Sequence, residues 1–155
     1  MNTESRLLEL GLELPEAPTP AGSYVPVRVW GHIVFVSGHT ASSKDQRKYL
    51  GKVGKEVSLE EAALSARDAC LNCLASLKNE LGSLDMVDRA IKVVGYVNSA
   101  PGFDQQPQVV NGASDLLVEL WGEQGRHARS AIGVAELPSG ASVELELIVG
   151  IKDRI

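Results

Sequence analysis

The final third of the chain contains two alternating stretches that most constrain its fold. Residues 127–138 read HARSAIGVAELP and residues 142–149 read SVELELIV, and in each the large apolar side chains of one face alternate with small or charged ones. Alternation of this kind indicates β-strands that bury one face. Because only a short segment separates them, the two stretches are expected to pair as an antiparallel hairpin.

The predicted hairpin has a core face and a small, charged face. The core face would hold Ile132, Val134, Val143, Leu145, Leu147 and Val149. The opposite face would hold Arg129, Ala131, Gly133, Ala135, Glu144 and Glu146. A planar guanidinium above small residues can bind a carboxylate through paired donors, and a glutamate nearby can orient or deprotonate water. In an unbulged register these two charged residues would lie roughly 13 Å apart between Cα atoms, at about 3.3 Å per residue. The alternative is an ordinary solvated face with two unrelated charges.

Composition excludes several classes of function. A chain of 155 residues suits one domain, and its net charge of -5 disfavours nucleic acid as a partner. The N-terminus lacks a basic segment followed by an apolar one, and no apolar stretch approaches the roughly 18 residues of a membrane span. We therefore expect a soluble, cytoplasmic protein without a membrane partner.

Cysteine and histidine positions argue against a redox pair or a metal site. Cys70 and Cys73 have the spacing of a redox motif. They fall well inside a predicted helix rather than at its N-terminus, so packing is the favoured interpretation. The three histidines are scattered, and no group of residues has metal-ligand spacing, so no metal is expected.

The order of predicted elements is strand, strand, helix, strand, helix, strand, strand. Residues 1–17 are expected to form an N-terminal arm and residues 18–155 a single domain. Strands are predicted at 24–30 and 32–38, followed by a long polar loop over 39–57. A helix begins at Ser58, which forms a capping-box pattern with Glu61, and ends at Gly82. A central strand at 89–98 and a helix over about 105–121 precede the hairpin.

Two helices can cover only one face of such a sheet. The other face would keep an unusual number of apolar side chains, drawn from Val34 or Phe35, Tyr96 or Val97, Ala131 and Gly133. We therefore predict a closed homo-oligomer with any cleft between subunits.

Several short motifs together resemble the RidA family, also called YjgF or L-PSP. They are Gly22-Ser23-Tyr24, Phe35-Val36-Ser37-Gly38-His39, the capped helix, Val97-Asn98-Ser99 with Phe103, Ala128-Arg129-Ser130, Leu137-Pro138 and Val143-Glu144-Leu145-Glu146. The resemblance covers about residues 18–152, and the loop with Gly51-Lys52-Val53-Gly54 is typical of a divergent branch.

The resemblance implies an α+β, chorismate-mutase-like fold and a homotrimer with sites at its subunit interfaces. It also implies cofactor-independent hydrolysis of small enamines or imines, such as 2-aminoacrylate and 2-iminobutanoate, to 2-oxo acids and ammonia. By similarity, Arg129 binds the substrate carboxylate, Glu144 positions the attacking water and Tyr24 lies near the pocket. The remaining substrate-binding candidates are Ser37, Gly38, His39, Asn98, Phe103 and Ala131.

Three positions depart from the family pattern. Ala131 stands where a cysteine is frequent, His39 replaces a glutamine and His127 replaces a common proline. If the missing thiol matters, the chain is instead a non-catalytic sensor that binds 2-oxo acids or similar small carboxylates. A ribonuclease role, attached to some relatives, is opposed by the net charge of -5.

Overall fold

The computed structural model describes residues 2–153 and contains one mixed sheet with helices. Its main elements are α1 (Thr3–Glu9), β1 (Val27–Trp30), β2 (Ile33–His39), α2 (Leu59–Leu81), β3 (Val87–Asn98), α3 (Gln106–Trp121), β4 (Ala128–Val134) and β5 (Val143–Ile151). The predicted order of strands and main helices is confirmed. Met1 and residues 154–155, at the ends of the predicted arm and domain, lie outside the described residues.

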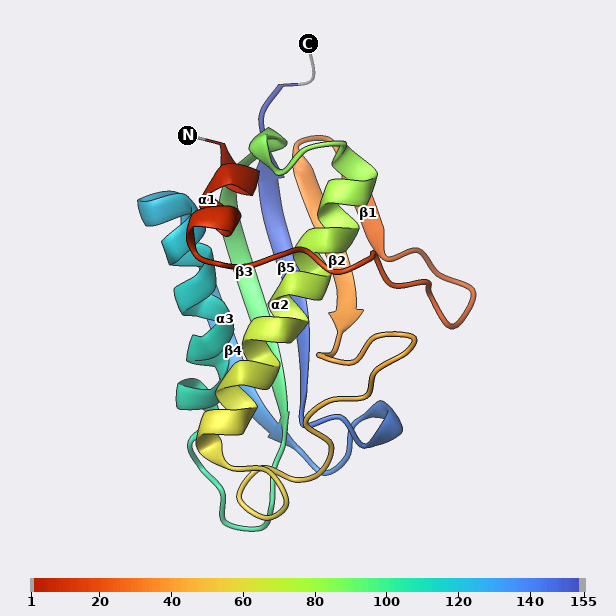
Figure 1. Cartoon of the computed structure of the whole chain (residues 1–155), viewed down its shortest axis with the longest axis vertical. Coiled ribbons are helices and arrows are strands. Elements are labelled where there is room, and N and C mark those ends of the chain that lie inside the picture. The colour runs from red at the N-terminus through yellow and green to blue at the C-terminus, as the bar shows by residue number, and fades with distance from the viewer. Residues whose placement is uncertain (1, 154–155) are drawn as a thin grey trace.

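The sheet has the strand order β1-β2-β5-β3-β4, in which only β3 and β4 are parallel. α2 and α3 pack side by side across one face of it, as Figure 1 shows. The expected α+β architecture with two helices on one face is therefore confirmed.

Local sequence signals define both long helices as expected. The Ser58 side chain accepts a hydrogen bond from the backbone N–H of Glu61, and Gly82 ends α2 with a positive φ of 84°. The apolar stripe of α3 is buried, and Gly122 ends that helix. Between the helices, Gly112 of α3 lies so close to the backbone of α2 that an added Cβ would stand 1.9 Å from the carbonyl oxygen of Ala63.

The predicted C-terminal hairpin is wrong. β4 pairs in parallel with β3, whereas β5 lies between β2 and β3 and pairs antiparallel with both. The connection passes through a 3-10 turn, η3 (Pro138–Gly140), which carries the chain past the end of β3. Arg129 and Glu144 are therefore two strands apart, with β3 between them, and the spacing worked out for a hairpin does not apply.

The predicted side-chain parity is also wrong on β4. Arg129 pairs with Val93, whose side chain is fully buried beneath the helices, so Arg129 shares the helix-covered face. Ala131 and Gly133 follow the same parity, and a Cβ on Gly133 would approach Gln106 of α3. Ile132, assigned to the core from its hydrophobicity, is instead 45% exposed on the open face. Glu144 and Glu146 do lie on the open face, as expected.

The open face of the sheet is largely apolar. Its exposed apolar side chains are Trp30, Ile33, Phe35, Ile91 and Ile132, joined by half-buried Val94, Tyr96 and Ile148. β3 is thus covered fully only on the helix side. The apolar face predicted from element order exists, although Phe35, Tyr96 and Ile132 supply it rather than Ala131 and Gly133.

The first helix packs on the body of the protein. Leu7 of α1 belongs to the main core, and the backbone N–H of Thr3 donates to Asp85 at 2.7 Å. The chain then runs across the helices toward the β1 side of the sheet (Figure 1). This path places residues 18–21 beside the end of β2, where they form one wall of the cavity described next.

Candidate functional site

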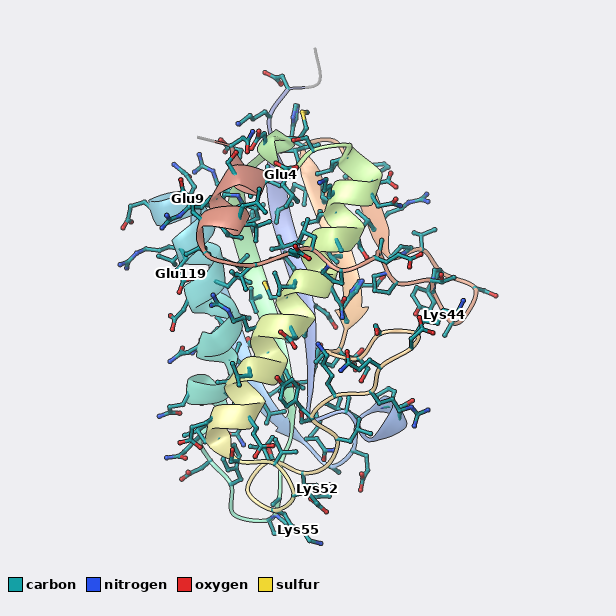
Figure 2. All side chains as sticks on the ribbon, viewed as in Figure 1. Glu4, Glu9, Lys44, Lys52, Lys55 and Glu119 are labelled. Carbon is teal, nitrogen blue, oxygen red and sulfur yellow. The ribbon has the colours of Figure 1, made fainter. Side chains whose placement is uncertain are left out.

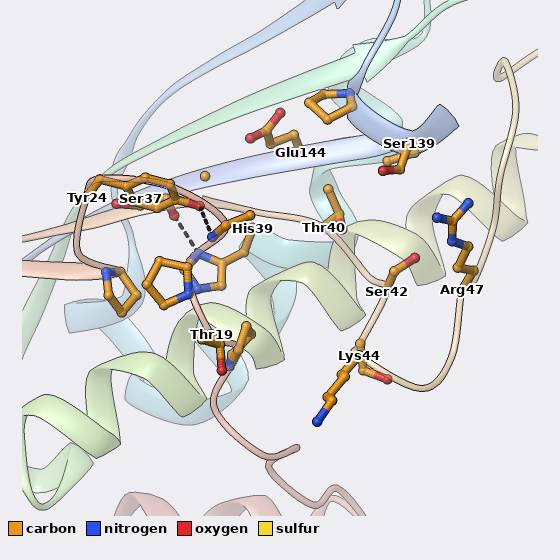
Figure 3. A pocket seen from close by; sticks show the side chains of 18 of the residues that line it. Thr19, Tyr24, Ser37, His39, Thr40, Ser42, Lys44, Arg47, Ser139 and Glu144 are labelled. Atoms are coloured by element: carbon orange, nitrogen blue, oxygen red, sulfur yellow. Dashed lines mark hydrogen bonds between the residues drawn. The ribbon is translucent and has the colours of Figure 1, made fainter.

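A cavity of about 430 Å³ lies where β2 ends and β5 begins, and we call it the Glu144 cavity. Figure 3 shows Tyr24, Ser37, His39 and Glu144 around it, together with side chains of the 40–50 loop. Its walls are residues 18–21, Tyr24, Pro26, residues 37–40, residues 42–44, Arg47, Leu50, Pro138, Ser139, Ala141 and Glu144. The predicted residues Tyr24, Ser37, Gly38, His39 and Glu144 are thus brought together.

A bulge at Ser37–Gly38 shapes this cavity. Val36 pairs with Leu147 and His39 with Leu145, so β2 has one extra residue over this step. The extra residue lets Gly38 lie against Glu144: a Cβ on Gly38 would stand 2.2 Å from its Oε1. Ser37 is fixed by its hydroxyl, which donates to the carbonyl of Val25 at 2.7 Å. A larger residue at this point would push the carboxylate away from its observed position.

Glu144 is a half-buried carboxylate with altered acidity. Burial raises its pKa above the ordinary value, and the neighbouring negative charge of Glu146 raises it further. Glu146 itself accepts a hydrogen bond from the hydroxyl of Tyr96 at 2.8 Å. Glu144 makes no hydrogen bond or ion pair with the described side chains, so its oxygens are available to water or ligand.

His39 forms part of the cavity wall and has both ring nitrogens engaged. Because a carbonyl oxygen can only accept, Nδ1–H donates to the carbonyl of Ser37 at 2.5 Å. Nε2 therefore accepts from the hydroxyl of Ser76 on α2 at 2.8 Å. Burial lowers the pKa of His39. The ring is neutral at neutral pH and braces the bulge against α2.

Arg129 lies in a separate, shallower depression, the Arg129 hollow. The hollow is lined by Asn111, Ser114, Asp115, Val118, Glu119, Arg126, His127 and Arg129. Nη1 of Arg129 donates to Oδ1 of Asn111 at 2.7 Å and to Oγ of Ser114 at 3.2 Å. Nε and Nη2 make no hydrogen bond within the described part of the chain. That free edge has the donor geometry that binds a carboxylate in bidentate fashion.

A histidine completes the contacts around Ser114. Nδ1–H of His127 donates to the carbonyl of Gly125 at 2.7 Å, so its Nε2 accepts from the hydroxyl of Ser114 at 2.9 Å. Burial lowers the pKa of His127, and the positive charge of Arg129 also lowers it. The neutral imidazole thus turns the serine lone pairs toward the guanidinium.

The remaining predicted site residues lie apart from both depressions. Asn98 is buried, accepts from Lys52 at 2.9 Å and donates to the carbonyl of Ala141 at 3.1 Å, which ties three chain segments together. Phe103 packs against Gly54, and Ala131 packs against the core below α3. Within one chain, these three residues support the scaffold.

Four residues that line the Glu144 cavity or the Arg129 hollow were not identified from the sequence. Lys44 and Arg47 line the Glu144 cavity from a polar loop whose path no local pattern specifies. Asn111 and Ser114 could have been found, because they lie one helical turn apart on the polar face of α3.

Other candidate chemistries find no support in residues 2–153. No group of metal-ligating side chains occurs there. Cys70 and Cys73 are fully buried, and burial raises the pKa of Cys70 to about 12, which confirms a packing role. No helix among these residues is long and apolar enough to cross a membrane.

Comparison with known proteins gives a family match over most of the chain. The family described as "YjgF/chorismate_mutase-like, putative endoribonuclease" matches residues 4–147. The chain is 42% identical to Atu1372 of Agrobacterium tumefaciens, a protein of unknown function, whose crystal structure superposes with a TM-score of 0.90. That match covers 97% of this chain and 92% of the other.

Two curated proteins are also similar over nearly their full lengths. Protein TCP17 of Trypanosoma cruzi is 39% identical over 150 residues, covering 96% of this chain and 94% of that protein. The 2-iminobutanoate/2-iminopropanoate deaminase of Dermatophagoides farinae is 28% identical over 144 residues, covering 91% and 95%. The named deaminase is thus the more distant of these two relatives.

Proposed function

This chain belongs to the YjgF/RidA/L-PSP family, with its chorismate-mutase-like fold, and on that premise we propose that it hydrolyses small carboxylate-bearing enamines or imines. The products are a 2-oxo acid and ammonia. The observation that carries the proposal is Glu144, a half-buried carboxylate of raised pKa that lies against Gly38 in a ligand-sized cavity.

The reaction requires little beyond positioning and proton transfer. Water adds to the carbon of the protonated C=NH2+ group and gives one proton to a carboxylate oxygen of Glu144, which leaves a neutral carbinolamine. Glu144 then returns that proton to the nitrogen, and the C–N bond breaks to release ammonia as the carbinolamine oxygen forms the C=O of the 2-oxo acid. The hydroxyl proton passes back to Glu144 and from there to the released ammonia, giving ammonium. A carboxyl with raised pKa suits this cycle, because a group that both takes up and releases a proton works best when its pKa lies near the pH of the reaction.

The substrate carboxylate is assigned to Arg129 of a neighbouring copy, so we propose that the site forms between subunits, in the homotrimer that the family resemblance implies. Arg129 lies on edge strand β4, whereas Glu144 and Tyr24 lie toward the opposite side of the sheet. A neighbouring copy that covers the apolar open face would bring its own β4 edge near the Glu144 cavity. The size of the exposed apolar face supports such an assembly.

The test is imine hydrolysis by matched glutamate variants. An amino-acid oxidase generates 2-iminobutanoate, and the rate of 2-oxobutanoate formation is measured against the uncatalysed rate. Glu144→Gln should abolish the acceleration, whereas Glu146→Gln, on the same face of β5, should retain most of it. Wild-type activity in Glu144→Gln, or in a folded Arg129→Ala variant, would refute the mechanism.

A non-catalytic sensor of 2-oxo acids is the second candidate. It is favoured by Ala131, which supplies no thiol where the family pattern has a cysteine. A rise in melting temperature with 2-oxobutanoate, combined with no imine hydrolysis by the wild-type protein, would identify the sensor.

A further inference from the structure

The Glu144 cavity has a positively charged wall that the proposed reaction does not use. Lys44 and Arg47 line it, and Glu144 is the one carboxylate among its described lining residues. The charged residues that line the cavity are thus mostly positive, whereas the chain as a whole has a net charge of -5. His39 adds no positive charge, because burial keeps it neutral. The cationic wall therefore belongs to this cavity in particular.

Arg47 is the cation best placed to contact a ligand. Figure 3 shows its guanidinium extending toward Ser42 and Ser139, on the side of the cavity away from Tyr24. It makes no hydrogen bond or ion pair with any residue from 2 to 153. Lys44 extends outward in the same view and projects from the body in Figure 2. A guanidinium with unused donors, in a cavity that also presents hydroxyl groups, can bind an anion.

The loop segment that carries Arg47 is held against the start of β5 by backbone hydrogen bonds. The backbone N–H of Gly51 donates to the carbonyl of Gly140 at 2.8 Å, and Leu50 forms a β-bridge with Ala141. Tyr49 and Ser139 both adopt positive φ, at 51° and 56°, which costs conformational energy in residues other than glycine. Backbone hydrogen bonds between these two strained segments thus fix the distance between the loop that carries Arg47 and the start of β5.

The cavity is also larger than a short imino acid needs. Sites that enclose drug-sized ligands are roughly 300–1,000 Å³, and a cavity of about 430 Å³ falls within that range. A short aliphatic imino acid reacting at Glu144 would leave the arginine side of the cavity filled only with water. A longer substrate with a polar end would occupy it.

We infer that the preferred substrate carries a second carboxylate, which Arg47 binds while the C=N carbon lies at Glu144. This inference rests on the proposed function and specifies its substrate class: dicarboxylic imino acids, and as stable analogues dicarboxylic 2-oxo acids. Such imines form when an acidic amino acid is oxidised at its α-carbon, so an oxidation of that class supplies the substrate. Ser42 and Ser139 line the same cavity and provide hydroxyl donors.

Two ligands of equal length test the inference by calorimetry. 2-Oxoglutarate carries the distal carboxylate, and 2-oxohexanoate replaces it with an uncharged ethyl group. The wild-type protein should bind 2-oxoglutarate about tenfold more tightly, since a hydrogen bond to a charged group stabilises by roughly 1.5 kcal/mol or more. Arg47→Gln should bring the affinity ratio close to one, and Arg47→Lys should restore part of it.

Lys55→Gln is the matched control, because it removes one positive charge from the same loop at a residue outside the cavity (Figure 2). It should leave the affinity ratio unchanged. Equal binding of both ligands by the wild-type protein, or a ratio that survives Arg47→Gln, overturns the second-carboxylate site alone. Failure of every 2-oxo acid to bind, with no imine hydrolysis, overturns the proposed function and this inference with it.

Discussion

Ser114→Ala should weaken binding of carboxylate ligands by acting through Arg129. In the structure, Oγ of Ser114 accepts from Nη1 of Arg129 at 3.2 Å and donates to Nε2 of His127 at 2.9 Å. Truncation removes one of the two acceptors that orient the guanidinium, while Asn111 remains at 2.7 Å. The variant should fold normally, because Ser114 is only half-buried and water can reach the orphaned imidazole nitrogen.

The magnitude follows from the geometry of this hydrogen bond. Hydrogen bonds to charged groups stabilise by about 1.5–3 kcal/mol, and a long, partly exposed one belongs at the low end. We therefore expect a loss of about 1.5 kcal/mol in ligand binding, which is about tenfold in the Kd for 2-oxobutanoate. In imine hydrolysis the effect should fall on KM rather than kcat, because carboxylate binding is shared by ground state and transition state.

A double-mutant cycle separates positioning from a direct role. If Ser114 acts through the guanidinium, Ser114→Ala should have little further effect on Kd in an Arg129→Ala background. Ser130→Ala, adjacent in sequence but on the opposite face of β4, serves as the control and should bind like the wild-type protein. Additive losses in the cycle, or an unchanged Kd in Ser114→Ala, would refute the positioning argument.

Three further predictions concern stability and assembly. Gly112→Ala should lower the free energy of unfolding by about 1–3 kcal/mol in urea titrations, because the new methyl group meets the rigid backbone carbonyl of Ala63; unchanged stability would mean that the helices separate easily. Glu144→Gln should be more stable than wild type at neutral pH, since the raised pKa means that folding disfavours the ionised carboxylate. That advantage should shrink as pH falls through the folded pKa toward the unfolded one, and a constant advantage across pH in thermal melts would contradict it. Ile132→Asp, on the exposed apolar face, should convert the proposed trimer to a monomer in sedimentation velocity, and an unchanged sedimentation coefficient would place the interface elsewhere.

Local signals in the sequence were sufficient to predict most helices and strands and the residues of the Glu144 cavity wall on β2. The serine cap, the glycine stops and the apolar stripes define α2 and α3, because helix ends and helix faces depend on residues only a few positions apart. The Phe35–His39 motif likewise identified the cavity wall around Glu144. Its bulge was not predicted, because an extra residue in β2 becomes visible only against the register of β5.

Tertiary structure alone decided which strands pair and which face each strand buries. Alternation within β4 was correctly detected, but alternation is symmetric and does not say which parity faces the helices. The choice depends on α3, which packs over Gly133 and Ala131 because they are small and so leaves Ile132 on the other face. The position of β5 between β2 and β3 likewise follows from the buried contacts of its five inward apolar residues with α2 and the neighbouring strands. The sequence alone thus determined the elements and the chemical groups, whereas long-range packing determined that Arg129 and Glu144 lie in different depressions of one chain.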